Sequence, residues 1–176
     1  MQNRATEGAN GDPAPVAEGG RPLAPRGRRA SKVIAEHLRR EQITRAVVLC
    51  SSATRARETL DVIAGGFGKE ARVQFEIEAR LHAASAGDLL ARLRQVQGDI
   101  ESVMLTGHDP AIRELALSLA SGGRRLEELG EKFPTAALAT LSFRGPRRSL
   151  APGAEELVAY VKPRELESPS WDTRKR

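Results

Sequence analysis

Two short turns in this chain combine residue types that could bind a phosphate group. The apolar run 47–50 predicts a buried strand, which ends at Ser51 and Ser52 before a helical pattern with Arg55 in its first turn. Backbone N–H groups at a helix N-terminus attract anions, and the planar guanidinium of arginine matches phosphate oxygens. We therefore predict an anion site at this turn, with helix capping by the two serines as the alternative role for their hydroxyls.

The second turn carries a histidine in the corresponding place. His108 follows a predicted strand at 102–106, and Asp109 and Pro110 fit the N-cap and the first position of the next helix. In a parallel sheet, ligand sites form beyond the carboxyl ends of the strands, so Arg55 and His108 should meet at one edge. Their pairing indicates a site for a small anion or a phosphorylated substrate.

The elements that would position this edge alternate along the chain. The predicted helices start near Gly27 (about fifteen residues), after Ser52, at 87–96 and after Pro110; the predicted strands lie at 47–50, 73–77, 102–106, 136–143 and 156–161. This alternation favours an α/β fold with a mostly parallel sheet covered on both faces. We expect His37 on the surface of the first helix, and residues 121–132 to form a surface excursion.

The length of 176 residues predicts a single domain. Residues 1–20 contain Gly, Ala, Pro, Asn and Glu without apolar periodicity, which predicts a disordered leader. The folded domain is expected over 21–164, and 165–176 form a charged tail.

Composition narrows the class of partner. The net charge is +5, but the arginines are spread along the chain and aromatic residues make up only 3%, so we do not expect nucleic-acid binding. Cys50 is the only cysteine, which excludes an internal disulfide and a Cys-based zinc site and predicts a buried thiol. No segment has the length of a membrane span or the apolar core of a signal peptide, so a cytoplasmic location is expected.

Four segments occur in an order that resembles the SixA-type phosphohistidine phosphatases of the histidine phosphatase (phosphoglycerate mutase-like) superfamily. They are Arg21–Ala30, Leu49–Thr59, Val103–Pro110 and Glu131–Ala139. The resemblance covers about 21–164. It implies a three-layer α/β/α sandwich, no metal or cofactor, and a phosphorylated protein or small phosphate ester as the partner.

The resemblance also implies roles for individual residues. In that family a histidine near the N-terminus attacks phosphorus, and water then releases phosphate. Arg55 matches the family arginine that holds phosphoryl oxygens, and His108 matches the second histidine, which donates to an equatorial oxygen in the transition state. Arg21, Arg26 and Ser52 are expected to bind substrate; a capping or surface role for the two arginines is the alternative.

The chain departs from the family at the nucleophile. The family begins with an apolar strand that ends in Arg-His, whereas the only histidines here are His37, His82 and His108. His82 falls in a loop where similar members tend to carry Tyr, and we do not expect it to replace the nucleophile. Without the first strand the sheet should expose unpaired backbone groups and an apolar groove, and the chain should be less stable than a complete member.

The sequence also does not indicate which carboxylate could act as a general acid. Glu76, Glu78 and Asp88 match no motif for a general acid. Three hypotheses follow. The chain is a phosphatase whose start codon has been placed too late, a degenerate member that binds phosphate without turnover, or a decayed remnant that keeps the fold alone.

Overall fold

The computed structural model describes residues 20–98 and 100–167, so residues 1–19 of the predicted leader (1–20) and most of the predicted tail lie outside the described residues. With η for 3₁₀ helices, the elements are α1 (Pro25–Glu41), β1 (Arg45–Ser51), α2 (Thr54–Ile63), η2 (Ala64–Gly66), β2 (Arg72–Glu78), η3 (Ala79–Leu81), α3 (Ala86–Arg94), β3 (Ser102–Thr106), α4 (Ala111–Leu119), β4 (Ala120–Gly122), α5 (Leu126–Glu131), β5 (Leu138–Ser142), η4 (Arg147–Ser149), β6 (Glu155–Val161) and α6 (Pro163–Leu166).

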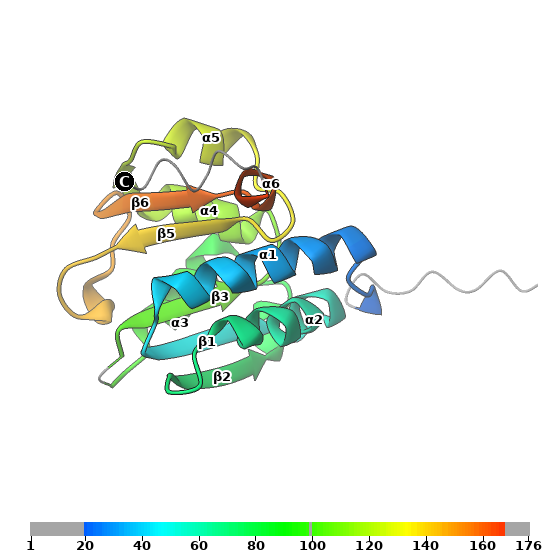
Figure 1. Ribbon diagram of the computed structural model, residues 1–176. Helices are drawn as coiled ribbons and strands as arrows, with labels where there is room; N and C mark the ends of the chain where they lie inside the picture. The colour runs from blue at the N-terminus through cyan, green and yellow to red at the C-terminus, as the bar shows by residue number, and fades with distance from the viewer. Residues whose placement is uncertain (1–19, 99, 168–176) are drawn as a thin grey trace, which may run out of the picture.

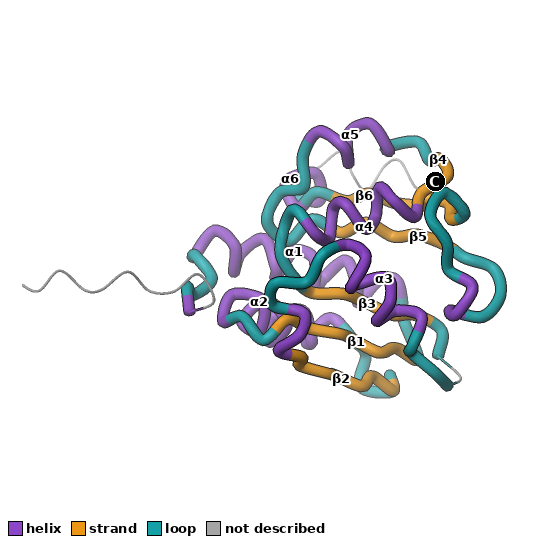
Figure 2. The backbone as a smooth tube through the Cα atoms, turned by 180° about the vertical axis from the view of Figure 1, so that it is seen from behind, coloured by secondary structure: helices purple, strands orange, loops and turns teal. Residues whose placement is uncertain are grey.

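Helices cover both faces of the strand β1, as Figures 1 and 2 show from opposite sides. Val47 and Leu49 pack toward α3 and α4, whereas Val48 and Cys50 pack toward α1 and α2. Side chains alternate across a strand, so an unbroken apolar run is buried only where both faces are covered. The predicted α/β fold with three layers is confirmed.

The strands form two sheets of three rather than one continuous sheet. The first has the order β2-β1-β3 with all strands parallel, and the second has the order β4-β6-β5, with β6 parallel to β4 and antiparallel to β5. Among the described strands, β3 and β5 each lie at a sheet edge, and residues of both line a cavity of about 940 Å³.

The expectation that His37 lies on the surface is wrong. This residue is only 9% exposed, and its Nε2 lies 3.8 Å from Oε1 of Glu41. His37 lies on the side of α1 that, with Ile34 and Leu38, lines this cavity, and α1 shares a core cluster with Val161 of β6 and Leu166 of α6. A second packing partner widens the buried stripe of a helix beyond the stripe that one sheet face would require.

Residues 121–132 are also more ordered than a surface excursion. They contain part of β4 and the short helix α5, whose Leu129 is fully buried against Leu157 and Tyr160. Only one apolar side chain anchors this segment strongly, so its periodicity is weak in the sequence.

The N-cap predicted for Asp109 is wrong as well. α4 begins at Ala111 with Pro110 at the N-cap position. The Asp109 carboxylate instead accepts a hydrogen bond from Nε of Arg113 at 3.0 Å, four residues along the helix. The ion pair thus uses the side chain that would otherwise have capped the helix.

An ion-pair network joins α6 and the residue before it to α5. Arg125 Nη2 lies 2.7 Å from Glu128 and 2.6 Å from Glu165, and Lys162 Nζ lies 2.7 Å from Glu128. Leu166 of α6 packs into the core beyond these contacts. The packed chain therefore continues slightly past residue 164.

We expect this network to make the protein sensitive to acid. Hydrogen bonds from Arg125 and Lys162 lower the pKa of Glu128 from 4.5 to about 2. A carboxylate whose pKa is lower in the folded state stabilises the fold above its unfolded pKa and loses that effect as the pH falls. The free energy of urea unfolding should therefore decline between pH 4.5 and 2, and Glu128→Gln should decline less steeply. Equal slopes for both proteins would contradict the prediction.

Candidate functional site

Arg55 and His108 meet at the carboxyl ends of two neighbouring strands. β1 and β3 are parallel and in register, with Cys50 opposite Thr106, so the turns that follow them lie side by side. Nε of Arg55 donates a hydrogen bond to Nδ1 of His108 at 3.1 Å, although the two residues are 53 positions apart in the chain. The structure thus brings together the pair that the sequence singled out; their roles remain a prediction.

This hydrogen bond orients the imidazole. When Nδ1 accepts, the neutral ring carries its proton on Nε2, which becomes the donor nitrogen. Arg55 uses only its Nε–H group for this contact. The other four of its five N–H donors are on the two terminal nitrogens of the guanidinium. The pair therefore combines a fixed cation with an imidazole of defined tautomer at one sheet edge.

The two serines before α2 are placed differently. Ser51 is fully buried, and its Oγ accepts a hydrogen bond from the backbone N–H of Ala53 at 3.3 Å. Ser52 is half-buried, and its backbone N–H donates to the carbonyl of Glu78 at 3.3 Å, which joins this turn to the end of β2. Ser52 is thus in the turn that leads to Arg55, as predicted, while Ser51 supports the backbone.

Arg21 and Arg26 are exposed, and Arg26 lies in the first turn of α1. Their segment is tied to the helix of Arg55 because Glu58 accepts a hydrogen bond from the backbone N–H of Leu23 at 2.6 Å. Glu58 was not predicted from the sequence. Its position three residues after Arg55, on the same face of α2, is the only signal that could have indicated it.

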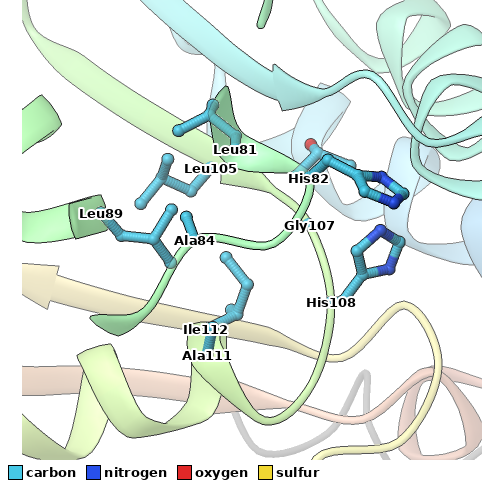
Figure 3. A pocket seen from close by; sticks show the side chains of 10 residues that line it. Leu81, His82, Ala84, Leu89, Leu105, Gly107, His108, Ala111 and Ile112 are labelled. Carbon is cyan, nitrogen blue, oxygen red and sulfur yellow. The ribbon is translucent and has the colours of Figure 1, made fainter. Parts of the chain in front are cut away.

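His82 also lies at this edge. It follows η3, and its ring stands edge to face with the ring of His108, with centroids 6.0 Å apart and an interplanar angle of 83°. Figure 3 shows the two imidazoles together beside a pocket with apolar walls. The pocket has a volume of about 20 Å³, which suffices for about one water molecule. A phosphate would therefore have to bind outside it, near the two rings.

The nearby carboxylates are poor proton donors. Burial disfavours the ionised form of Glu78, but hydrogen bonds from Arg80 and Arg92 outweigh it and lower the pKa. Arg92 also forms an ion pair with Glu76. Hydrogen bonds from the side chain and backbone of Ser85 lower the pKa of Asp88. Glu78 and Asp88 are therefore ionised at neutral pH, which disfavours them as general acids.

Cys50 lies one residue before the Ser-Ser turn and is fully buried. Burial raises the pKa of its thiol from 9.0 to about 11. The folded state therefore favours the neutral thiol, and this stabilisation is complete below pH 9 and lost between pH 9 and 11. Over that window, urea unfolding of the wild type should lose more free energy than unfolding of Cys50→Ala. If both proteins lose the same amount, the thiol does not contribute.

Within residues 20–98 and 100–167, no group of three or more His, Cys, Asp and Glu side chains could hold a metal ion. None of the helices in the described part of the chain is long and apolar enough to cross a membrane.

Known proteins resemble this chain in sequence and in fold. The family model of the histidine phosphatase superfamily (branch 1) matches residues 9–102 of the sequence. An uncharacterized protein of Mycobacterium tuberculosis (strain H37Rv) is 34% identical over 156 residues, which cover 86% of this chain and 95% of that one. An uncharacterized protein of Mycobacterium leprae is 31% identical over 167 residues, which cover 93% and 100%.

Two solved structures are similar in fold. The SixA structure from Nakamurella multipartitia has a TM-score of 0.74 and 27% identity, covering 86% of this chain and 90% of that one. The structure of the protein histidine phosphatase SixA complexed with tungstate has a TM-score of 0.66 and 24% identity, covering 90% and 94%.

Proposed function

Because the chain belongs to the histidine phosphatase superfamily (branch 1), and so to a class with phosphatase-type function, we propose that its Arg55–His108 pair binds the phosphoryl group of a phosphohistidine or phosphate ester. The single observation that carries this proposal is the 3.1 Å hydrogen bond between the two side chains, at the strand ends where α/β sheets bind ligands. The substrate would be a phosphorylated protein or a small phosphate ester.

The two side chains suit complementary tasks. Arg55 can offer its remaining N–H donors to two phosphoryl oxygens, in a planar arrangement that lysine lacks. Nε2 of His108 is buried, so the imidazole would have to turn before Nε2 donates to an equatorial oxygen. Phosphoryl transfer has a loose transition state with charge on these oxygens, so positioning and charge stabilisation supply most of the catalysis. Exposed Arg21, Arg26 and the Ser52 turn would contribute to substrate binding around this pair.

The covalent step of the proposed reaction needs a histidine that attacks phosphorus and then loses the phosphoryl group to water. None of the described histidines is assigned to this step. His37 is buried in α1, His108 is committed to the phosphoryl oxygens, and exposed His82 follows η3 instead of a buried strand. The second candidate is therefore a module that binds phosphate without turnover.

A paired measurement tests both candidates. Orthovanadate and phosphate binding to the chain is measured by calorimetry, and hydrolysis is followed with a phosphohistidine-bearing protein and with p-nitrophenyl phosphate. Binding with turnover supports the phosphatase, and binding without turnover supports the module. If neither anion binds at millimolar concentration, the Arg55–His108 pair is not a phosphate site and both candidates fail.

A further inference from the structure

The outer strand β2 exposes large apolar side chains. Within the described residues β2 pairs with β1 along one edge only, and Figure 1 shows it as the lowest strand of its sheet. None of the seven residues of β2 is buried, whereas six of the seven residues of β1 are. Phe75 and Ile77 of β2 are 44% and 52% exposed. The open edge of this strand therefore adjoins an uncovered apolar surface.

These apolar side chains share one face of β2. Val73 and Phe67 pack against the core cluster formed with α1 and α2. The ring of Phe67 stands edge to face with the ring of Phe75, with centroids 6.1 Å apart. Because side chains alternate across a strand, Ile77 lies on this face as well. The apolar face thus continues from the core outward to the free edge.

The opposite face of β2 carries charges of both signs. Arg72 at the start of the strand is exposed. Near the end, Glu76 and Glu78 form ion pairs with Arg92 of α3, and Glu78 also binds Arg80. Two copies of this strand that run antiparallel would place the arginine at the start of one opposite the glutamates at the end of the other.

The backbone determines which residues could pair across this edge. The N–H of Arg72 donates to the carbonyl of Thr44 at 2.7 Å, and the carbonyl of Glu78 accepts from the N–H of Ser52 at 3.3 Å, so both groups point toward β1. The N–H and C=O of one residue point to the same side of a strand, and successive residues alternate. The residues whose backbone groups point away from β1 are therefore Val73, Phe75 and Ile77.

We propose that β2 binds β2 of a second copy of this chain, antiparallel and about a two-fold axis at Phe75. In this register all three outward-pointing residues form hydrogen-bonded pairs. The facing pairs are Phe75 with Phe75, Val73 with Ile77, Gln74 with Glu76 and Arg72 with Glu78. Apolar side chains thus face apolar ones and opposite charges face each other, and both kinds of cross-strand pair are stabilising. This inference does not depend on the proposed phosphate site.

Other registers fit less well. A slide of two residues in one direction places Glu76 opposite its own copy, and like charges directly opposite are destabilising. A slide in the other direction pairs Ile77 with Ala71, which precedes the strand. β2 also lacks the features that block pairing at an edge: it contains no lysine or proline, and its register with β1 is free of bulges over seven residues. The pairing would join the first sheets of two copies into one sheet of six strands.

Cysteine cross-linking tests both the pairing and its register. Phe75→Cys places the thiols of two copies at the two-fold axis, where the Cα atoms of a hydrogen-bonded pair lie about 5.5 Å apart, within reach of a disulfide. Ile77→Cys is the control, because this position is more exposed but lies roughly 14 Å along the strand from its own copy. Oxidation by copper phenanthroline should link Phe75→Cys into a covalent dimer and leave Ile77→Cys unlinked. The native Cys50 is fully buried and does not compete.

Sedimentation of the full chain provides a second measurement. The wild type should change from monomer to dimer between about 1 and 200 µM, since an interface of this small size binds weakly. Ile77→Lys should weaken association more than about 10-fold, because it replaces an apolar contact with Val73 by a charge. Val158→Lys changes another exposed apolar side chain, on β6, and should associate as the wild type does.

Two results of the sedimentation experiment would overturn the proposal. The first is a wild type that stays monomeric over this range, and the second is self-association that Ile77→Lys leaves unchanged. Preferential cross-linking of Ile77→Cys over Phe75→Cys would reject the axis at Phe75. Should Ile77→Lys fail to fold, the comparison of the two cysteine variants still decides.

Discussion

Replacing Arg55 by alanine should weaken phosphate or orthovanadate binding by about 100-fold. The substitution removes the donors proposed for two phosphoryl oxygens and also the hydrogen bond that orients Nδ1 of His108. Hydrogen bonds to charged groups contribute roughly 1.5–3 kcal/mol each, and a tenfold change in affinity corresponds to about 1.4 kcal/mol. Calorimetric titration of the purified variant with orthovanadate measures the effect.

Two further variants separate geometry from charge. Arg55→Lys keeps the positive charge but not the planar set of donors, so its affinity should lie between those of wild type and Arg55→Ala. Arg57→Ala removes an exposed arginine from the same helix and should bind as the wild type does. Wild-type affinity in Arg55→Lys would remove the bidentate contact from the proposal, and equal losses in Arg57→Ala would indicate unspecific attraction to a basic helix.

The meeting of Arg55 and His108 could be predicted because it depends on backbone topology. Consecutive strand–helix units give parallel strands, and parallel strands place their carboxyl ends at one edge. The register of β1 with β3 then brings together residues that are 53 positions apart. No detail of side-chain packing was needed for this part of the site.

Other parts of the site depend on packing that one segment does not encode. His82 approaches His108 because β2 pairs with the far side of β1 and η3 then turns back toward the strand ends. His37 lies on the side of α1 that lines the cavity with residues of β3 and β5, and α6 from the distant C-terminal part of the chain also contacts α1. The apolar periodicity of a helix indicates only one surface against which the helix packs, so its contacts with a second surface are not predicted.

The sequence gives only a partial account of the division into two sheets. The structure shows a cavity lined by residues of β3 and β5. The sequence predicted unpaired backbone groups and an apolar groove for a chain without the family's first strand, and this stays a prediction. It also predicted lower stability than in a complete family member, which remains a prediction. The pattern of the chain did not predict that helices α1 and α4 would both line the cavity between these strands.

The position of α1, one wall of that cavity, depends on a close contact with the turn after α2. Gly66 is buried, and a Cβ atom added to it would lie 2.4 Å from the carbonyl oxygen of Ala35 and 2.9 Å from its Cα. These neighbours are backbone atoms in the middle of a helix and cannot move independently. Gly66→Ala should therefore displace α1 and lower the free energy of unfolding by about 3 kcal/mol, as overpacking of a core does.

Gly65 provides the matched control, since a Cβ atom added to it meets nothing within 4 Å. Gly65→Ala makes the same chemical change one residue earlier in η2 and should alter the stability by less than about 0.5 kcal/mol. Urea unfolding followed by circular dichroism compares the two variants with the wild type. Similar stabilities for both variants would show that α1 and η2 pack less closely than described, and the wall formed by α1 would then be adjustable rather than fixed.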